Sequence, residues 1–524
     1  MASPAEPGSG TSTSAIGDIS WDPGQPGSWL RNFRLGEWLT GPVSPLFETW
    51  ALTAIEERMT ATYERWMGYR APRPLHVVVN GWYYYGFNVI PTNPARMLWV
   101  FVRYLVPAFV LRPRRAALLM PPLAHFGVGL AHREWRDDLQ PRYRRAVAEA
   151  EAALPSADPL QAIRIVEELL GIAGDYFTAI TTVGGYAAKA EHALARFYQT
   201  ELGPRIGGSV LELVSGISDT SSLVAAHAVH GLDWVDPPVG SPLDGQLTSE
   251  GELAGATGRA GARDRRAAAE TRARTALAAE PRKLARFDAL LAEAQSYGRI
   301  REEQAAEFTL AWPTLRSAVL RLGAALVQRG CLARAEKVFD LRRDELLDAL
   351  AVEPSTACRE IDILTDERRA RRSTQAGLAA PLMLGQLHPM MADLARSIGQ
   401  ALRGDPPAGT GALVGIPASP GVARGRVRIV RGPDEFDHVR PGDVLVSPTT
   451  TPAWTPLFGT VVAVVTDTGG LGAHASIVAR EYGLPAVVGV EGATTSLTDG
   501  QFIEVDGSAG VIRAVDPGIS ADSG

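Results

Sequence analysis

The sequence predicts a multidomain protein of mixed α and α/β class, in which a large, mostly helical part is followed by a small α/β module. Three observations support this prediction. Apolar residues recur at helical spacing through residues 141–215 and again up to about residue 400. A stretch rich in Gly and Pro follows at residues 403–411. Beyond it, short apolar or alternating runs are separated by Gly, Pro and Asp, which is typical of strands.

Length and composition narrow the class of protein further. The chain has 524 residues, enough for three or four domains of roughly 150 residues each. Hydrophobic residues make up 46% and charged residues 21%, which indicates a globular chain. The net charge of −6 argues against a nucleic-acid partner, since such domains need a basic face. The 2 cysteines are too few for a disulfide framework or a cysteine zinc site, so a reducing compartment is expected.

The N-terminal segment and one apolar stretch bear on location. Residues 1–20 are rich in Ser, Gly and Pro, which predicts a disordered tail without the basic and apolar regions of a secretory signal. Residues 97–111 are apolar but contain Arg103 and Pro107, and a spanning helix needs about 20 apolar residues. A buried helix is the preferred interpretation and interfacial membrane contact is the alternative. A cytoplasmic protein without a membrane partner is expected.

The helical part is expected to occupy residues 21–400. The β-branched residues 77–79 predict a strand that enters a turn, and Pro155 and Pro159 should separate two helices. Residues 236–262 are rich in Gly, Pro and small polar residues, which predicts a loop or insertion. The Arg-rich residues after it, 263–280, mix acids with bases and predict a helix with a solvated face.

The C-terminal part is expected to consist of a hinge linker at 401–412, a compact α/β module at 413–515 and a short tail at 516–524. Flexible Gly/Pro spacing without large apolar residues gives the module reach, so it should swivel about the linker. One helix is expected from about Ala475 to Tyr482. Strands are expected at residues 427–430, 444–446, 461–465, 486–488, 502–505 and 511–515.

Residues 466–489 form the motif that carries chemistry. A buried strand ends at Val465, a loop containing Gly469 and Gly470 follows, and a helix begins close to His474. Glycines let backbone N–H groups approach an anion, and the N-terminus of a helix favours negative charge. A histidine placed there can offer a ring nitrogen as a nucleophile toward phosphorus. The alternative is that His474 only packs or forms hydrogen bonds, because a Gly-Gly loop before a helix is common.

Several segments resemble the phosphohistidine mobile domain of the PEP-utilising enzymes, the family of PEP synthase, pyruvate phosphate dikinase and rifampin phosphotransferase. They are the glycine pair 469–470, HASIVARE at 474–481, GLPAVVG at 483–489, SPGVARG at 419–425 and TPAWTPL at 451–457. The resemblance covers about residues 413–515 and implies that His474 carries the phosphoryl group. It also implies that Thr468, Gly469, Gly470, Ser476 and Arg480 form the phosphoryl-binding loop, with a surface ion pair as the alternative for Arg480.

The helical part resembles the substrate-binding domain of rifampin phosphotransferase, through RLGEWLTGPVSPL at 34–46, WPTLR at 312–316 and KVFDLRRDEL at 337–346. This resemblance implies a pocket within 21–400 for a small, hydrophobic, hydroxyl-bearing acceptor. Apolar walls with few polar groups are typical of such sites. The candidate lining residues are Glu37, Trp38, Trp82, Tyr83 and Tyr85, with Glu37 or His76 as a general base. The alternative is that the aromatic residues belong to the core and that Glu37 is solvated or caps a helix.

Members of the family normally begin with an ATP-grasp domain that phosphorylates the histidine. The substrate-domain resemblance starts within the first 40 residues, and none of the three lysines lies on a glycine-rich loop. We therefore expect no directly bound cofactor and no metal, with ATP and Mg²⁺ reaching His474 through a separate ATP-grasp protein. That partner would convert ATP to AMP and phosphate and leave the β-phosphoryl group on His474.

The predicted function is that of the phosphohistidine-carrying component of a split ATP-dependent dikinase or phosphotransferase acting on a hydroxyl group. Two alternatives remain open. Phosphorylation could drive a dehydration or a condensation in secondary metabolism, or the chain could be a non-catalytic binding protein that kept the carrier fold.

Overall fold

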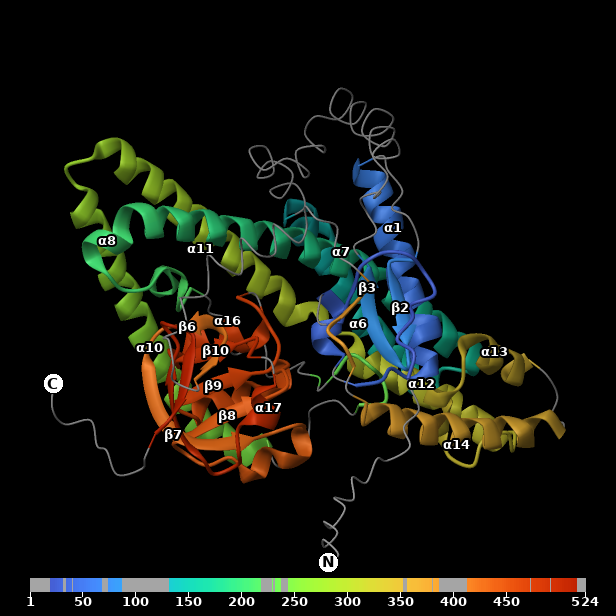
Figure 1. Cartoon of the computed structure of the whole chain (residues 1–524). Coiled ribbons are helices and arrows are strands. Elements are labelled where there is room, and N and C mark those ends of the chain that lie inside the picture. The colour runs from blue at the N-terminus through green and yellow to red at the C-terminus, as the bar shows by residue number, and fades with distance from the viewer. Residues whose placement is uncertain are drawn as a thin grey trace, which may run out of the picture.

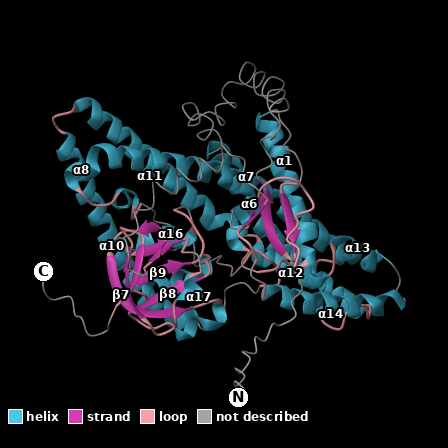
Figure 2. Cartoon of the chain, viewed as in Figure 1, coloured by secondary structure: helices cyan, strands magenta, loops and turns pink. Residues whose placement is uncertain are grey.

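The computed structural model describes two regions of the chain, a helical part and a C-terminal α/β module (Figure 1). The described residues are 19–31, 34–39, 41–67, 74–86, 132–217, 229, 231–236, 244–351, 356–378, 380–385, 412–471, 473–490 and 492–515. The predicted tails, the helix expected at 97–111 and the hinge at 403–411 lie outside these residues. The predicted fold class, a large helical part followed by a small α/β module, is confirmed (Figure 2).

The helical part is organised around α7 (Pro159–Phe197), which packs against α1 (Thr53–Met67), α11 (Pro281–Phe308) and α12 (Trp312–Gln328). Helix α7 begins with a capping box in which Asp158 and Gln161 exchange hydrogen bonds, and Pro159 stands in its first turn. The preceding helix has ended at Ala153, so the break lies where Pro155 and Pro159 predicted it. The other helices are α6 (Gln140–Ala153), α8 (Gly203–Ile206), α10 (Asp244–Leu277), α13 (Arg343–Ala351) and α14 (Thr356–Ala376).

The prediction of a loop over residues 236–262 is wrong, because α10 begins at Asp244. Between Asp244 and Leu277 the sequence has no proline, and alanines are interspersed among its glycines. Alanine has the highest helix propensity, and each glycine costs only about 1 kcal/mol relative to it. The glycines therefore destabilise the helix less than the sequence interpretation assumed. Further along, Arg274 pairs with Glu270 and Asp288, which confirms the solvated face predicted there.

A small antiparallel sheet lies beside the helices, with the strand order β2-β3-β1-β4. Its strands are β1 (Trp29–Leu30), β2 (His76–Val79), β3 (Trp82–Gly86) and β4 (Met383–Leu384). The strand predicted at 77–79 is confirmed. Asn80 and Gly81 both have positive φ, 50° and 83°, so a tight two-residue turn joins β2 to β3.

The C-terminal module is an eight-stranded mixed sheet with the order β5-β12-β11-β7-β8-β9-β10-β6. Its centre, β7 to β10, is parallel, and the remaining pairs are antiparallel. The strands are β5 (Leu413–Val414), β6 (Ile416–Ser419), β7 (Val422–Ile429), β8 (Asp443–Ser447), β9 (Ala463–Thr466), β10 (Ala486–Val488), β11 (Phe502–Asp506) and β12 (Val511–Ala514). Each predicted strand overlaps one of these.

Both faces of this sheet are buried, as expected where parallel strands form the centre. One face packs against α16 (His474–Tyr482) and the 3₁₀ helix Pro452–Gly459 through Ala475, Leu457 and Phe458. The other face packs against α17 (Ala493–Ser496). Helix α16 was predicted to within one residue. Its position, directly after the loop that leaves β9, sets the geometry of the candidate site.

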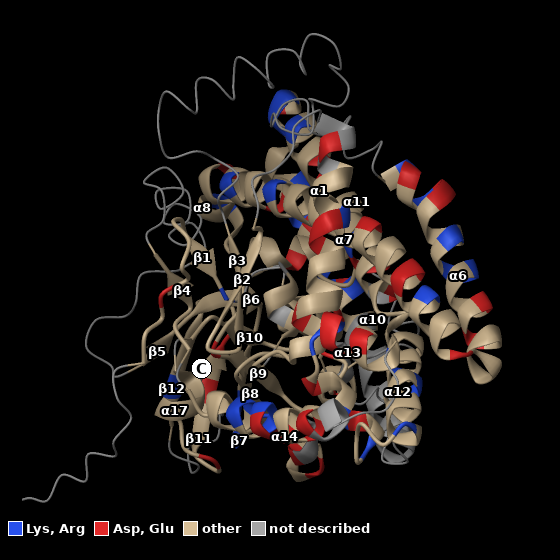
Figure 3. Cartoon of the chain, turned by 90° about the vertical axis from the view of Figure 1, so that its right-hand side faces the viewer, with Lys and Arg blue, Asp and Glu red and all other residues tan. Residues whose placement is uncertain are grey.

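The module lies against the helical part beside α10, which contacts both α16 and the 3₁₀ helix Pro452–Gly459 (Figure 1). Glu481 of α16 accepts a hydrogen bond from the backbone N–H of Ile217 at 3.1 Å, and Leu471 packs against the apolar cluster between α7 and α11. Acidic and basic residues both occur along the helices, for example on α6 (Figure 3). Among the described residues, none of the helices is both long and apolar enough to cross a membrane.

Candidate active site

The glycine-rich loop joins the end of β9 to the start of α16. Gly469 has a φ of 127°, which a residue with a side chain rarely adopts. The carbonyl of Gly470 accepts hydrogen bonds from the Ser476 hydroxyl at 2.7 Å and from the Ala473 N–H at 3.0 Å. Thr468 donates from its hydroxyl to the Pro448 carbonyl at 2.9 Å. The loop is thus held by its own residues and by the first turn of α16.

Arg480 is buried, and its guanidinium holds the glycine loop through hydrogen bonds to the backbone. Its guanidinium donates to the carbonyls of Leu471, at 2.9 Å, and Ala418, at 3.0 Å. Burial lowers the pKa of Arg480 below its ordinary value, with the nearby charges making smaller contributions. The alternative of a surface ion pair is therefore wrong for this residue. Arg480, Thr468 and Ser476 all direct their donors at backbone carbonyls, so their contact with a phosphoryl group stays a prediction.

The ring of His474 is held at both nitrogens. Nδ1 lies 2.8 Å from the Thr450 hydroxyl and Nε2 lies 3.3 Å from the Thr455 hydroxyl. The edge of Phe458 meets the ring with centroids 5.9 Å apart. Each hydroxyl can donate to or accept from the ring nitrogen that it meets, and the tautomer with its proton on Nδ1 leaves the lone pair of Nε2 for attack on phosphorus. Sequence reasoning missed Thr450, although it stands in the threonine run that precedes the TPAWTPL segment.

Burial also fixes the charge of this ring. It lowers the pKa of His474 from 6.5 to about 3, so the imidazole is neutral at physiological pH. Only the neutral ring has a lone pair to donate. The site thus keeps His474 in the protonation state that nucleophilic attack requires.

The lowered pKa predicts a loss of stability in acid. Between pH 6.5 and about 3 the unfolded state binds a proton at His474 that the folded state does not, so stability falls as the pH falls through that window. Thermal unfolding at pH 7.5 and pH 4.5 should show a larger drop in Tm for the wild type than for His474→Gln. The exposed His438 supplies the control, because His438→Gln should behave as the wild type does. Equal drops in wild type and His474→Gln would contradict the prediction.

The contact with Thr450 predicts a positioning effect on the ring. Thr450→Val removes one hydrogen bond of about 1 kcal/mol, so phosphorylation of His474 should slow by about fivefold. Thr449→Val is the matched control, because the neighbouring threonine uses its carbonyl, which accepts a hydrogen bond from the Ser447 hydroxyl. Initial rates of label incorporation measure both variants. An unchanged rate in Thr450→Val would show that the Thr450 hydroxyl does not position the ring of His474.

The predicted acceptor residues lie apart from the glycine loop in sequence and are mostly packed in the core. Tyr83 and Tyr85 belong to the main apolar cluster of the helical part, and Tyr83 stacks on His76 at 5.8 Å. The Trp82 indole donates to the Gln375 carbonyl at 3.1 Å and lies under the Arg31 guanidinium. These contacts match the alternative in which the aromatic residues form core, and lining of an acceptor pocket stays a prediction.

Trp38 and Glu37 lie on the 3₁₀ helix Arg34–Trp38. Trp38 is half-buried, and its ring meets Phe308 edge-on at 5.7 Å, while the side chain of Glu37 lies outside the described residues. His76 pairs with the Glu56 carboxylate at 2.7 Å. The partner of His76 is therefore a buried carboxylate, and its use as a general base stays a prediction.

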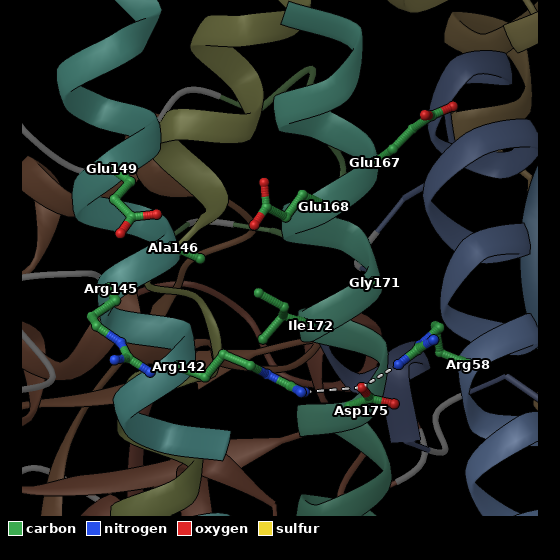
Figure 4. Close-up of a pocket in the computed structure, with 10 residues that line it drawn as sticks. All are labelled: Arg58, Arg142, Arg145, Ala146, Glu149, Glu167, Glu168, Gly171, Ile172 and Asp175. Atoms are coloured by element: carbon green, nitrogen blue, oxygen red, sulfur yellow. Dashed lines mark hydrogen bonds and ion pairs between the residues drawn. The ribbon is translucent and has the colours of Figure 1, made fainter. Parts of the chain in front are cut away.

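A cavity of about 520 Å³ opens between α1, α6 and α7 (Figure 4). Two of its carboxylates are paired with arginines, because Asp175 contacts Arg58 and Arg142 of the cavity and Glu167 contacts Arg343. Among the described residues, no group of His, Cys, Asp and Glu side chains is arranged to hold a metal ion. The glycine loop with His474 is therefore the feature whose geometry points to chemistry.

Residues 439–510 match the family model of the PEP-utilising enzyme, mobile domain. The resemblance drawn from the His474 motif is confirmed by this match. The matched residues include the threonine run, the glycine loop and the whole of α16.

Curated relatives extend the similarity. The chain is 40% identical over 197 residues to the uncharacterized phosphotransferase YvkC of Bacillus subtilis. The aligned region makes up 38% of this chain and 23% of that relative. It is 40% identical over 205 residues to the rifampicin phosphotransferase of Streptomyces sviceus, covering 38% and 21%. It is 38% identical over 208 residues to the chondramide synthase cmdD of Chondromyces crocatus, covering 38% and 5%. The similarity thus spans less than a quarter of the length of each of these relatives.

Proposed function

We propose that this chain is a phosphohistidine-carrying phosphotransferase, which accepts a phosphoryl group on His474 and passes it to the hydroxyl group of a small, hydrophobic molecule. One observation carries the proposal. A neutral histidine stands at the first position of α16, directly after a glycine loop, with a threonine hydroxyl at each ring nitrogen. The match to the mobile domain and the relatives named as phosphotransferases support the same chemistry.

In the charging step, the Nε2 lone pair attacks the phosphorus atom of the donor. The N–P bond forms while the bond from phosphorus to the donor oxygen breaks, and that oxygen keeps the electron pair. In the second step the oxygen of the acceptor hydroxyl forms a bond to phosphorus, its proton passes to solvent water and the N–P bond breaks. The N–P electron pair returns to Nε2, so the neutral ring with its proton on Nδ1 is restored.

The donor in this proposal is ATP with Mg²⁺, bound by a separate ATP-grasp protein in the cytoplasm. Two of the chain's lysines are engaged in ion pairs that hold helices together. Lys283 pairs with Glu201 and Glu280, and Lys337 pairs with Asp362 and Asp366. Lysines used in this way are not available to neutralise the phosphates of a nucleotide, which supports a donor site on another chain.

Labelling with ATP tests the proposal. The purified chain is incubated with β-³²P-ATP, with and without a stand-alone ATP-grasp protein encoded beside it. Acid-labile, base-stable label that requires the partner is the expected result. Label without the partner would contradict the separate donor, and the absence of label with an ATP-binding partner would overturn the carrier function. Rifampicin is the first acceptor to assay, because a relative is named for its phosphorylation.

The relative named as a synthase favours one second candidate, in which phosphorylation activates a group for condensation. The two functions differ in their products. A phosphorylated acceptor that accumulates supports the phosphotransferase, whereas free phosphate released together with a condensed product supports the synthase.

A further inference from the structure

The C-terminal module contacts the helical part through residues that flank His474 in the chain. Leu471, three residues before the histidine, packs against the apolar cluster between α7 and α11. Glu481, near the end of the helix that His474 begins, accepts a hydrogen bond from the Ile217 N–H at 3.1 Å. The loop before the histidine and the helix after it therefore both touch the helical part.

A further contact reaches the hydrogen-bond partner of the ring. The Thr451 hydroxyl donates to the Val229 carbonyl of the helical part at 3.4 Å, and Thr451 is buried. Thr451 directly follows Thr450, whose hydroxyl meets Nδ1 of His474. Helix α10 also contacts the 3₁₀ helix Pro452–Gly459, which supplies the second hydroxyl at the ring. In this docked arrangement, every segment that holds the ring thus touches the helical part.

The contact made by Leu471 is apolar. The cluster that receives it contains Tyr186 of α7 and Tyr297 and Ile300 of α11. Leu471 lies in the glycine loop itself, so the loop can leave the helical part only when this side chain is exposed to water. Exposure of apolar surface is unfavourable, and the contact therefore favours the docked arrangement.

The contact made by Glu481 is polar, and its donor is fixed in place by α11. A Cβ at Gly298 of α11 would lie 2.7 Å from Cδ1 of Ile217 and 3.8 Å from Oε1 of Glu191. Ile217 thus packs into the space that the missing side chain leaves, beside the buried ion pair of Glu191 with Arg301 at 3.0 Å. The N–H that Glu481 receives is therefore held by a rigid part of the molecule.

We propose that Leu471 and Glu481 form a docking latch, which holds the module on the helical part and closes His474 to a phosphoryl donor until it opens. The inference rests on the proposed function and names what controls access to its histidine. The docked arrangement is the one for transfer, since the acceptor is expected in the helical part. Charging of His474 requires the open latch.

The position of the latch makes the two steps exclude one another. A donor protein has to bring its phosphorus atom up to Nε2 of His474, so its surface must lie against the same loop and the same helix. Leu471 is three residues from the ring, and its place is taken while the module is docked. The donor and the helical part therefore compete for one face of the module, and the strength of the latch sets the balance between them.

Labelling with potassium phosphoramidate tests the latch without a partner protein. The P–N bond of the reagent breaks, ammonia leaves, and the new N–P bond forms on a histidine ring. Peptide mass spectrometry in base measures the initial rate at His474 relative to that at His438, which is exposed on the same module and reports the reagent in each sample. The ratio of the two rates follows the fraction of molecules in which the latch is open.

Both latch variants should raise this ratio. Leu471→Ala should raise it about tenfold, because most of a half-buried apolar side chain is lost from the docked arrangement. Glu481→Ala should raise it about fivefold, because one hydrogen bond is lost. Glu481→Gln keeps an oxygen that accepts from Ile217 and should stay close to the wild type.

Two more variants separate docking from local changes in the glycine loop. Gly298→Leu fills the space under Ile217 from the helical side, so it should raise the ratio although it lies outside the module. Val422→Ala is the matched control, because Val422 is an exposed apolar residue of the module on β7, and it should match the wild type.

Hydrogen exchange distinguishes opening of the latch from unfolding. The Ile217 amide should exchange faster in Leu471→Ala and Glu481→Ala, while the amides of β9 keep the wild-type rate. Ratios equal to that of the wild type in both variants overturn the latch, and so does faster labelling accompanied by faster exchange in β9. Label on His438 but not on His474 in every variant overturns the carrier function instead.

Discussion

His474→Ala should carry no acid-labile phosphoryl label under conditions in which the wild-type chain is labelled. The substitution removes the imidazole ring, whose two nitrogens contact the hydroxyls of Thr450 and Thr455. None of the other groups at the loop can replace it, because Ser476 and Arg480 donate to backbone carbonyls. Label is measured after quenching in base and again after acid treatment, and the expected loss is complete.

The position of the phosphoryl group on the ring is part of the same expected result. Because Thr450 holds Nδ1 at 2.8 Å, the phosphorus should be bonded to Nε2, which ³¹P–¹H NMR of the charged chain distinguishes. His438→Ala is the control, since its ring is exposed and should leave labelling unchanged. Label that persists in His474→Ala would mean that another residue carries the group, and the carrier assignment would fail.

Arg480→Ala should destabilise the C-terminal module by about 3 kcal/mol, since hydrogen bonds from a charged donor contribute about 1.5–3 kcal/mol each. The guanidinium is buried and joins two segments, because it donates to Ala418 on β6 and to Leu471 in the glycine loop. Removing it leaves both carbonyls without this donor. Hydrogen exchange of the amides of β9, β10 and α16 reports the free energy of opening of the module itself.

The control for this variant is Arg431→Ala, because Arg431 is exposed and its side chain forms no hydrogen bond or ion pair with the residues that the structure describes. Arg480→Lys keeps the charge but offers a single nitrogen, so it should recover only part of the stability. If Arg480→Ala exchanged at the wild-type rate, the guanidinium would not be the anchor of the loop. A low labelling rate with unchanged exchange would instead indicate direct contact with the phosphoryl group.

The parts of the site that follow one another in the chain could be predicted from the sequence. The end of β9, the loop with Gly469 and the start of α16 at His474 are consecutive, so strand pattern, glycines and helix start were visible together. Thr450 could not be found in this way. It meets the ring across a gap of 24 residues, so no local pattern in the sequence joins the two.

The helix α10 shows a different limit of sequence reasoning. Its glycines and polar residues resemble a linker when local composition is all that is considered. In the folded chain, part of this helix packs against the module, with Arg265 donating to the Gly483 carbonyl, and contacts of this kind favour helix where propensity alone is marginal. Arg480 was misplaced for a related reason, because the two carbonyls that receive its guanidinium come from separate segments.

Helix α7 sets a fixed spacing in the molecule. It has 39 residues, which at 1.5 Å per residue corresponds to a rod of about 58 Å. Its first half, from Ala162 to Ala179, packs into the cluster that contains Trp234, and its second half, from Val183 to Phe197, packs into the cluster that receives Leu471. One continuous helix thus fixes the distance between the cluster that receives Leu471 of the module and the cluster that contains Trp234. An inserted residue in its middle would turn one end by about 100° relative to the other, so its length and phase are constrained together.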